Sequence, residues 1–307
     1  MKLSIRHETH YEYSAPLKYA LQQLCLTPQA NAHQEVVEWQ LSAPGQLYAQ
    51  RDGFGNLSHS WSMARARGGR HVYQGSVQAH GTVATRPSAW LVDDLAAPHP
   101  VLYLRATALT QADAALAELG REFVEAHAGE DQLLGLAAEV SRRIAYRAGV
   151  TDVGTTAQQA LAIGAGVCQD QAHVFIAACR AAGLPARYVS GYFHSPKAPE
   201  LASHAWADVC LDLAERRWLS VDITHLCLMD ERHVRLAVGP DYAACAPVRG
   251  VREGGGDESM RVRVSCRASQ DSAFIAASML GSGKGYGAMI RRMRPMTSGA
   301  AIALPMR

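Results

Sequence analysis

The sequence predicts an α+β protein, in which a β-rich N-terminal module precedes a helix that is packed on an antiparallel sheet. Three observations support this prediction. Short alternating segments with glycine turns fill residues 1–85, helical patterns follow from about residue 110, and alternating segments return after residue 185. Runs of strands and runs of helices in this succession are typical of α+β folds, in which helices cover one face of an antiparallel sheet.

The composition of the 307-residue chain allows a sizeable buried core. Hydrophobic residues make up 48% of the chain, charged residues make up 19%, and the net charge is +2. This near balance of charge, without basic runs interleaved with aromatic residues, argues against nucleic acid as a partner. No stretch approaches the roughly 18 consecutive apolar residues of a membrane span, so no membrane partner is expected either.

Cysteine usage and the first residues both bear on the cellular compartment. The segment MKLSIRHETHYEYS alternates polar and apolar residues and lacks the continuous apolar core of a signal peptide. The seven cysteines are an odd number and lack paired spacing, which favours free thiols and a cytoplasmic location. They are Cys25, Cys168, Cys179, Cys210, Cys227, Cys245 and Cys266.

Residues 1–85 are expected to form the β-rich module, and residues 86–110 a connector. Segments such as KLSIRHETHYEYS and VVEWQLS alternate, and the turn cluster at residues 52–56, DGFGN, is typical of a hairpin. A flexible tether would be polar and rich in glycine and serine. The connector instead holds many apolar side chains, so we expect the module to pack against the core.

The predicted core, residues 111–266, begins with helices and leads to a cysteine. Helices are expected from about Thr110 to His127 and from about Asp131 to Tyr146. A shorter helix is expected after Thr156, because TTAQQAL has the spacing of a capping box. The next helix, from Gln169 to Ala182, has apolar residues at helical spacing and ends at a glycine and a proline.

Cys168 stands at the mouth of this last helix, directly after the small residues of GAGV. Most cysteines are small core residues. However, a helix N-terminus carries unsatisfied N–H groups and a partial positive charge, and both stabilise a thiolate. Cys168 is therefore a candidate nucleophile, provided that the chain supplies partners for it. Asp170, in the first turn, is expected to cap the helix rather than to act as a base.

A thiol nucleophile needs a base, and the base needs a group that orients it. In the segment ASHAWADVCL, alternation places His204 and Asp208 on one face of a strand. If this strand pairs with WLSVDIT so that Asp208 lies opposite Trp218, then His204 lies opposite Asp222, with Cβ atoms about 5 Å apart. A slip of one residue would point the two side chains to opposite faces. This pairing predicts His204 as the base and Asp222 as its orienting group.

Three segments resemble the bacterial transglutaminase-like superfamily, whose members are named as cysteine proteases. These segments are GVCQDQAHVFIAACRAAGLPARYVSGY, SHAWADV and WLSVDITH. In that family they carry a Cys-His-Asp triad, which falls here on Cys168, His204 and Asp222. The resemblance implies a papain/transglutaminase-like core that closes with DYAACAPVRGVREGGGDESMRVRV, preceded by the β-rich N-terminal region of the family. The family commonly has Asp-Pro-Thr where this chain has Asp222-Ile223-Thr224.

The implied chemistry is acyl transfer on an amide bond of a peptide or protein substrate. Cys168 attacks the carbonyl group and forms a thioester, which water or an amine resolves. Hydrolysis of a peptide or isopeptide bond is expected, because water needs no second binding site, and transfer to an amine is the alternative. The backbone N–H of Cys168 can stabilise the oxyanion, and Gln158, Gln159 and Tyr146 are candidates for a second donor. No cofactor is expected.

Three other interpretations stay open. A non-catalytic module could use the cleft of the same fold to bind a peptide. A metal site could involve Cys210, Cys227, His225 and His233, but no pair of cysteines has the usual zinc spacing, so no metal is predicted. Another acyl-transfer enzyme, like an arylamine acetyltransferase or a peptide-glycanase, could share the core, although no signature of coenzyme A or glycan binding is visible.

Residues 267–307 differ in composition from the rest of the chain. They show no clear period and hold five of the nine methionines. Segments of this kind bury too little apolar surface to offset the entropy of ordering them. We therefore expect an irregular or disordered tail.

Overall fold

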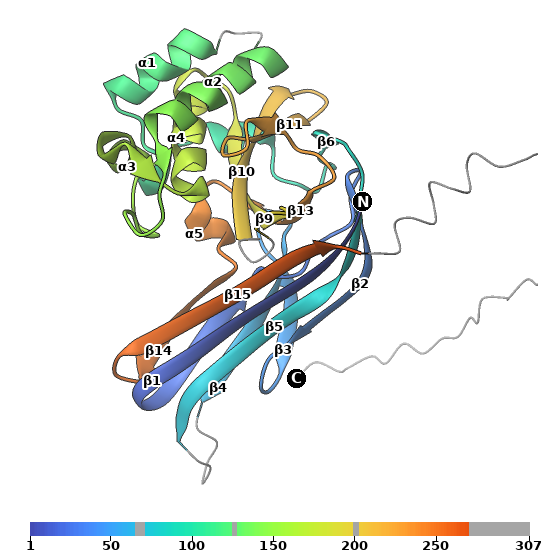
Figure 1. Cartoon of the computed structure of the whole chain (residues 1–307), viewed down its shortest axis with the longest axis vertical. Coiled ribbons are helices and arrows are strands. Elements are labelled where there is room, and N and C mark those ends of the chain that lie inside the picture. The colour runs from blue at the N-terminus through green and yellow to red at the C-terminus, as the bar shows by residue number, and fades with distance from the viewer. Residues whose placement is uncertain (65–70, 125–127, 199–202, 270–307) are drawn as a thin grey trace, which may run out of the picture. The chain divides into compact units, whose positions relative to one another are not determined.

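Two antiparallel sheets organise the residues that the computed structural model describes, which are 1–64, 71–124, 128–198 and 203–269 (Figure 1). A seven-stranded sheet, called the N-terminal sheet, holds the first strands of the chain, and a six-stranded sheet, called the core sheet, packs against helices. The predicted α+β class is thus confirmed. Most of the expected tail, residues 270–307, lies outside the described part.

The N-terminal sheet is built around one long strand, β1 (Lys2–Leu24). Its first half pairs with β5 and β15, and its second half pairs with β4 and β14. Two outer strands, β2 and β3, pair with β5 and β4. The bounds are β2 (Gln34–Ser42), β3 (Leu47–Arg51), β4 (Leu57–Ala64), β5 (Val72–Thr85), β14 (Val248–Gly254) and β15 (Glu258–Ala268).

The placement of β14 and β15 differs from the expected core boundary at residue 266. Residues 248–268 pair with β1 rather than with the core sheet. The physical reason is the length of β1, whose second edge would otherwise leave many backbone N–H and C=O groups unpaired. The end of β15 also alternates, and its Val264 and Cys266 are buried opposite His7 and Ile5 of β1.

The core consists of helices on the core sheet, whose strand order is β12-β11-β10-β9-β13. Its strands are β9 (Ala186–Phe193), β10 (Ser203–Asp212), β11 (Arg217–Asp222), β12 (Cys227–Leu228) and β13 (His233–Gly239). Its helices are α1 (Ala114–Phe123), α2 (Glu130–Arg143), α3 (Ala157–Ile163), α4 (Cys168–Ala181) and α5 (Tyr242–Cys245). Within the described residues, no helix combines the length and the apolar character needed to cross a membrane.

The helix boundaries follow local capping chemistry. α1 begins after Asp113, whose carboxylate accepts the N–H of Leu116, and not at Thr110 as the sequence suggested. Thr110 ends a short 3-10 helix, Ala108–Thr110, and another spans Pro100–Leu104. The Thr156–Gln159 capping box of α3 forms as predicted. Helix α4 is buried on almost every side, because α1, α2 and α3 cover it while its apolar residues pack on β10.

The expected connector, residues 86–110, is partly a strand of the core sheet. Residues Trp90–Val92 form β6, which pairs with β11, and Leu91 is buried. The N-terminal sheet also shares a hydrophobic cluster with Tyr192, Val234 and Leu236 of the core. The apolar connector therefore indicated correctly that the module packs against the core instead of being tethered freely.

The core sheet also contains a buried ionic cluster, which is centred on Asp208 of β10. The Asp208 carboxylate accepts hydrogen bonds from Arg187 at 2.9 Å and from Arg235 at 2.6 Å. Burial by itself would raise the pKa of Asp208, but Arg235 and Arg187 lower it to about 2. Asp208 has no exposed surface, so its charge depends on these two partners and on the hydroxyl of Ser220 for compensation.

Asp208→Ala should lower the free energy of unfolding by on the order of 3–5 kcal/mol, because two buried guanidinium groups would lose their shared carboxylate. Urea denaturation measures this loss. Glu139→Ala is the matched control, since Glu139 also binds two arginines, Arg142 and Arg143, but on the surface of α2. The control should lose far less, because exposed ion pairs contribute little. Equal losses for the two variants would contradict the assignment.

Candidate active site

Cys168 is the first residue of α4, and its side chain is half-buried. The segment that leads to Cys168 has no room for a side chain at Gly166, because a Cβ atom there would lie 2.5 Å from the Asp170 carboxylate. Gly164, which ends α3, has a left-handed φ of 69°, a conformation that favours glycine. The small residues before Cys168 are thus needed to place the thiol at the helix mouth.

Asp170 caps the helix, as the sequence predicted. Its Oδ2 atom accepts the backbone N–H of Val167 at 2.7 Å and the hydroxyl of Thr151 at 2.7 Å. Asp170 is buried and binds the loop before α3 to the start of α4. The carboxylate therefore holds the backbone around Cys168 in place.

The structure brings His204 and Asp222 together, but in a strand register other than the expected one. Asp208 of β10 lies opposite Ser220 of β11, so the predicted register is wrong by two residues. A bulge shifts the register between Cys210 and Asp212, and the turn that follows is held by the Asp212 carboxylate and by Arg216, which adopts a φ of 48°. A shift of two residues leaves every side chain on its face. His204 Nε2 consequently lies 2.8 Å from Asp222 Oδ2.

Asp222 is fully buried and is surrounded by nitrogen atoms. Its Oδ1 atom accepts the backbone N–H groups of Thr224 and His225, while Oδ2 lies within 3.0 Å of three imidazole nitrogens. The imidazoles are those of His204, His225 and His233. Burial by itself would raise the pKa of Asp222. These histidines, of which His204 has the largest effect, instead hold the pKa well below its ordinary value. Asp222 is therefore an ionised carboxylate inside the protein.

His204 interacts with both Asp222 and Cys168. Burial lowers the pKa of His204, but Asp222 and, to a smaller extent, the Cys168 thiol raise it, to about 10 overall. Because Nε2 is bound to Asp222, Nδ1 is the nitrogen that remains for the thiol. The predicted site residues thus form a continuous chain from the mouth of α4, through the start of β10, to the end of β11.

Two polar residues that the sequence did not single out connect the helix to the Asp222 turn. Gln171 of α4 is buried, and its amide donates to Ile144 O at 2.9 Å. Its Oε1 atom accepts the hydroxyl of Thr224 at 2.7 Å. This contact fixes the distance between the element that carries Cys168 and the element that carries Asp222. No spacing rule could have found it, because the partners are 53 positions apart.

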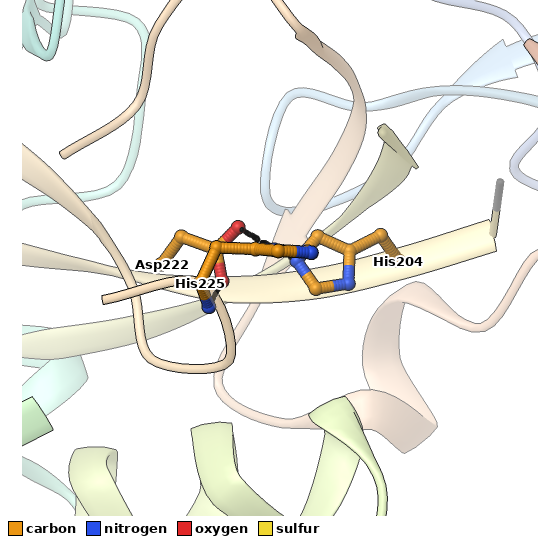
Figure 2. A group of neighbouring side chains, drawn as sticks. All are labelled: His204, Asp222 and His225. Atoms are coloured by element: carbon orange, nitrogen blue, oxygen red, sulfur yellow. Dashed lines mark hydrogen bonds and ion pairs between the residues drawn. The ribbon is translucent and has the colours of Figure 1, made fainter. Parts of the chain in front are cut away.

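His225 and His233 complete the surroundings of Asp222. Figure 2 shows Asp222 with the His204 and His225 rings directed toward its carboxylate. The His225 ring stacks on Phe193, with ring centroids 3.9 Å apart. Both histidines were considered as metal ligands from the sequence, together with Cys227 and Cys210. The structure places Cys227 beside this cluster, whereas Cys210 lies away from it and donates its thiol hydrogen to Asp212 O.

The contacts of the three candidates for a second oxyanion donor distinguish them from one another. The amide of Gln158 donates to Gln111 O, and Gln159 belongs to the capping box of α3. Tyr146 belongs to β7 (Ala145–Tyr146), which pairs with β8 (Ala165–Gly166), and only Val167 separates β8 from Cys168. Burial raises the pKa of Tyr146, and the neighbouring Cys168 raises it further. Of the three, Tyr146 is thus the residue whose strand adjoins the segment that leads to the nucleophile.

Comparison with known proteins matches two parts of the chain to protein families. Residues 117–223 match the transglutaminase-like superfamily, and residues 3–79 match the bacterial transglutaminase-like N-terminal region. The first match contains all three residues of the candidate site. The second covers most of the strands of the N-terminal sheet that come before the core in the sequence.

Relatives of similar length align with most of the chain. An uncharacterized protein of Mycobacterium tuberculosis is 30% identical over 285 residues, which cover 80% of this chain and 86% of the relative. An uncharacterized protein of Mycobacterium leprae is 26% identical over 275 residues, covering 86% and 97%. A solved structure from Cytophaga hutchinsonii, provisionally named a cysteine protease, has the same fold, with a TM-score of 0.67, 21% identity, and coverage of 87% and 90%. The chain therefore belongs to the transglutaminase-like superfamily and carries the bacterial N-terminal region of that family.

Proposed function

We propose that this protein is a cysteine-dependent enzyme that hydrolyses a peptide or isopeptide bond through a thioester on Cys168. The observation that carries the proposal is the position of His204, which lies 2.8 Å from a buried carboxylate and also interacts with Cys168. A nucleophile, a base and an orienting group in contact are the requirement for this chemistry. The proposed substrate is a peptide or a protein.

In the proposed mechanism, His204 holds the proton of the Cys168 thiol in an imidazolium–thiolate pair, as its raised pKa favours, and the thiolate attacks the amide carbonyl. The backbone N–H of Cys168, at the helix mouth, stabilises the oxyanion of the tetrahedral intermediate. His204 then donates its proton to the leaving amine, and a thioester remains. Water, deprotonated by His204, attacks the thioester and releases the acid, so that the thiol is regenerated. Throughout, Asp222 holds the imidazole with Nε2 turned away from the sulfur.

Two alternatives use the same fold. A transamidase would resolve the thioester with an amine, and a non-catalytic module would only bind a peptide. The buried Asp222 favours catalysis over simple binding, because keeping an ionised carboxylate out of water is costly and a peptide-binding cleft has no need of it. To separate hydrolysis from transfer, a peptide library can be incubated with the protein with and without a fluorescent primary amine. Mass spectrometry should show new carboxyl ends, and amine incorporation in their place would favour the transamidase.

Iodoacetamide should label Cys168 faster than any other cysteine at neutral pH, as measured by peptide mapping. Cys227 is the matched internal control, because it is half-buried like Cys168. Burial, Asp222 and Asp230 raise the pKa of Cys227 to about 12, so Cys227 should react slowly. His204→Ala should remove the advantage of Cys168. If Cys168 is labelled no faster than Cys227 in the unmodified protein, the proposed nucleophile is wrong.

Asp222→Asn should lower turnover of a cleaved library peptide by roughly 10²–10⁴, because an amide can favour the wrong imidazole tautomer. Asp230→Asn is the matched control, since Asp230 contacts His233 and Arg232 without touching His204. The control should retain turnover per folded molecule, and thermal melting of both variants gives the folded fraction. Normal turnover of Asp222→Asn would leave, at best, a dyad of Cys168 and His204.

The stabilisation that Asp222 provides should depend on pH with two limits. The pKa of His204 is raised from 6.5 to about 10, so its contribution is fully present below pH 6.5 and is lost as pH rises through 10. The pKa of Asp222 is lowered from 3.8, so its contribution is present above about pH 4 and is lost under stronger acid. The difference in unfolding free energy between the unmodified protein and Asp222→Asn should therefore shrink from pH 7 to pH 10.

Urea denaturation across this pH range measures that difference. Asp208→Asn is the control, because Asp208 is paired with two arginines rather than with a histidine. Its deficit should stay constant from pH 7 to pH 10. A constant deficit for Asp222→Asn as well would show that His204 gains no stabilising charge from Asp222.

A further inference from the structure

The surroundings of Asp222 have the composition of a metal site. One ligand atom each of His204, Asp222 and His225 lie within 4.8 Å of one another. His204 Nε2 is 2.8 Å from Asp222 Oδ2, and His225 Nδ1 is 2.7 Å from the same oxygen (Figure 2). Two imidazole nitrogens with one carboxylate oxygen suit Zn²⁺, whereas Ca²⁺ and Mg²⁺ prefer oxygen ligands alone.

We propose that His204, Asp222 and His225 bind a divalent transition-metal ion of the Zn²⁺ type, and that the bound ion switches the active site off. The three protein ligands would leave a fourth position of the ion open to water. The ligand atoms are somewhat closer together than in a zinc site with bonds of about 2.0 Å, so side-chain shifts of a few tenths of an ångström would admit the ion.

Two features of His225 prepare this site. Its ring is held by stacking on Phe193, with an interplanar angle of 20°, so little freedom is lost on binding. Its side chain is also 35% exposed, compared with 6% for His204 and 0% for Asp222. A hydrated ion would thus reach the buried carboxylate from the side on which His225 lies.

The hydrogen bonds at Asp222 are arranged so that a metal ion can replace two of them. Oδ2 has two lone pairs but faces three imidazole nitrogens, those of His204, His225 and His233. An ion bound to His204 and His225 would leave His233 as the hydrogen-bond donor to Oδ2. The ring proton of each ligating histidine would move to its other nitrogen or be released to solvent.

A second set of ligand types, Asp222, Cys227 and His233, is less suited to an ion. Its ligand atoms also lie within 4.8 Å of one another. However, His233 is completely buried, and its other ring nitrogen is engaged with Asp230. The guanidinium of Arg232 lies 3.6 Å from the Cys227 sulfur and opposes a cation there. The structure therefore favours the set that contains His225.

The inhibitory half of the proposal rests on the proposed function. An ion on His204 Nε2 would replace the hydrogen bond to Asp222 and lower the basicity of the ring, so His204 could no longer take the thiol proton. The binding half does not depend on catalysis. The result of a calorimetric test of metal binding is therefore independent of whether the protein hydrolyses peptides.

The binding test is a calorimetric titration of the full chain with ZnCl₂ in a buffer that does not chelate. One ion per chain is expected, and Cys168→Ala should bind it equally well, because the thiol is not a ligand. His225→Asn keeps an amide near Asp222 but removes the ligand nitrogen, and it should weaken binding by about 10–100-fold or more. His80→Asn, at an exposed histidine of β5, is the matched control and should keep full affinity.

Three outcomes would overturn the proposal. Binding that is lost in Cys168→Ala but kept in His225→Asn would place the ion on the nucleophile. Binding that is lost in Cys227→Ser alone would place it on the second set. Absence of binding to the unmodified protein would exclude both sets. If His225→Asn does not fold, anomalous scattering from a zinc-soaked crystal of the unmodified protein decides, with a peak expected between His204 Nε2, Asp222 and His225 Nδ1.

The inhibitory half is tested by alkylation, which needs no substrate. Zn²⁺ should slow the iodoacetamide labelling of Cys168, and EDTA should restore the rate. In His225→Asn the ratio of rates with and without Zn²⁺ should approach one, whereas in His80→Asn it should match the unmodified protein. Labelling that Zn²⁺ does not change, despite binding in calorimetry, would refute the switch while leaving the metal site in place.

Discussion

The buried charge of Asp222 is the constraint on which the rest of the site depends. Taking a carboxylate out of water costs several kcal/mol, and the cost is offset only if partners surround it. Here the partners come from three separate elements. The turn after β11 supplies two backbone N–H groups and His225, β10 supplies His204, and β13 supplies His233. Because each partner is needed to compensate the same charge, the position of His204 relative to Cys168 is fixed by the folding of the whole core sheet.

The N-terminal sheet takes part in this arrangement through β13. The imidazole of His33 lies 2.8 Å from the backbone oxygen of His233, and the side chain of Gln34 binds both backbone groups of Arg235. These contacts hold the strand that presents His233 to Asp222 and Arg235 to Asp208. The β-rich module thus stabilises the two buried carboxylates of the core sheet, although none of the three triad residues comes from it.

The sequence predicts some features of this protein well, and physical reasons separate them from the rest. Alternation in a strand has a period of two. It therefore places His204 and Asp222 on the same face of the sheet for any register that is shifted by an even number of residues. The register itself depends on the capped turn at Asp212, which alternation does not report. Likewise, the pairing of β15 with β1 and the contact of Gln171 with Thr224 join distant segments, and no local pattern encodes them. His225 and His233 were visible as histidines, but only the fold makes them neighbours of Asp222.

The Asp222 carboxylate orients the base, and the side chains around it also determine which ligands could regulate the site. A triad needs one donor on Asp222, the imidazole of the base, yet this chain directs three imidazoles to one oxygen atom. The two additional rings raise the density of metal ligands around the base without adding a proton-transfer step to the proposed mechanism. His233 is inaccessible and pairs with Asp230, so a role in compensating charge is sufficient to explain it. His225 is exposed, is braced by Phe193, and lies next to the base. Its position is explained more completely by a ligand that arrives from solvent than by charge compensation alone.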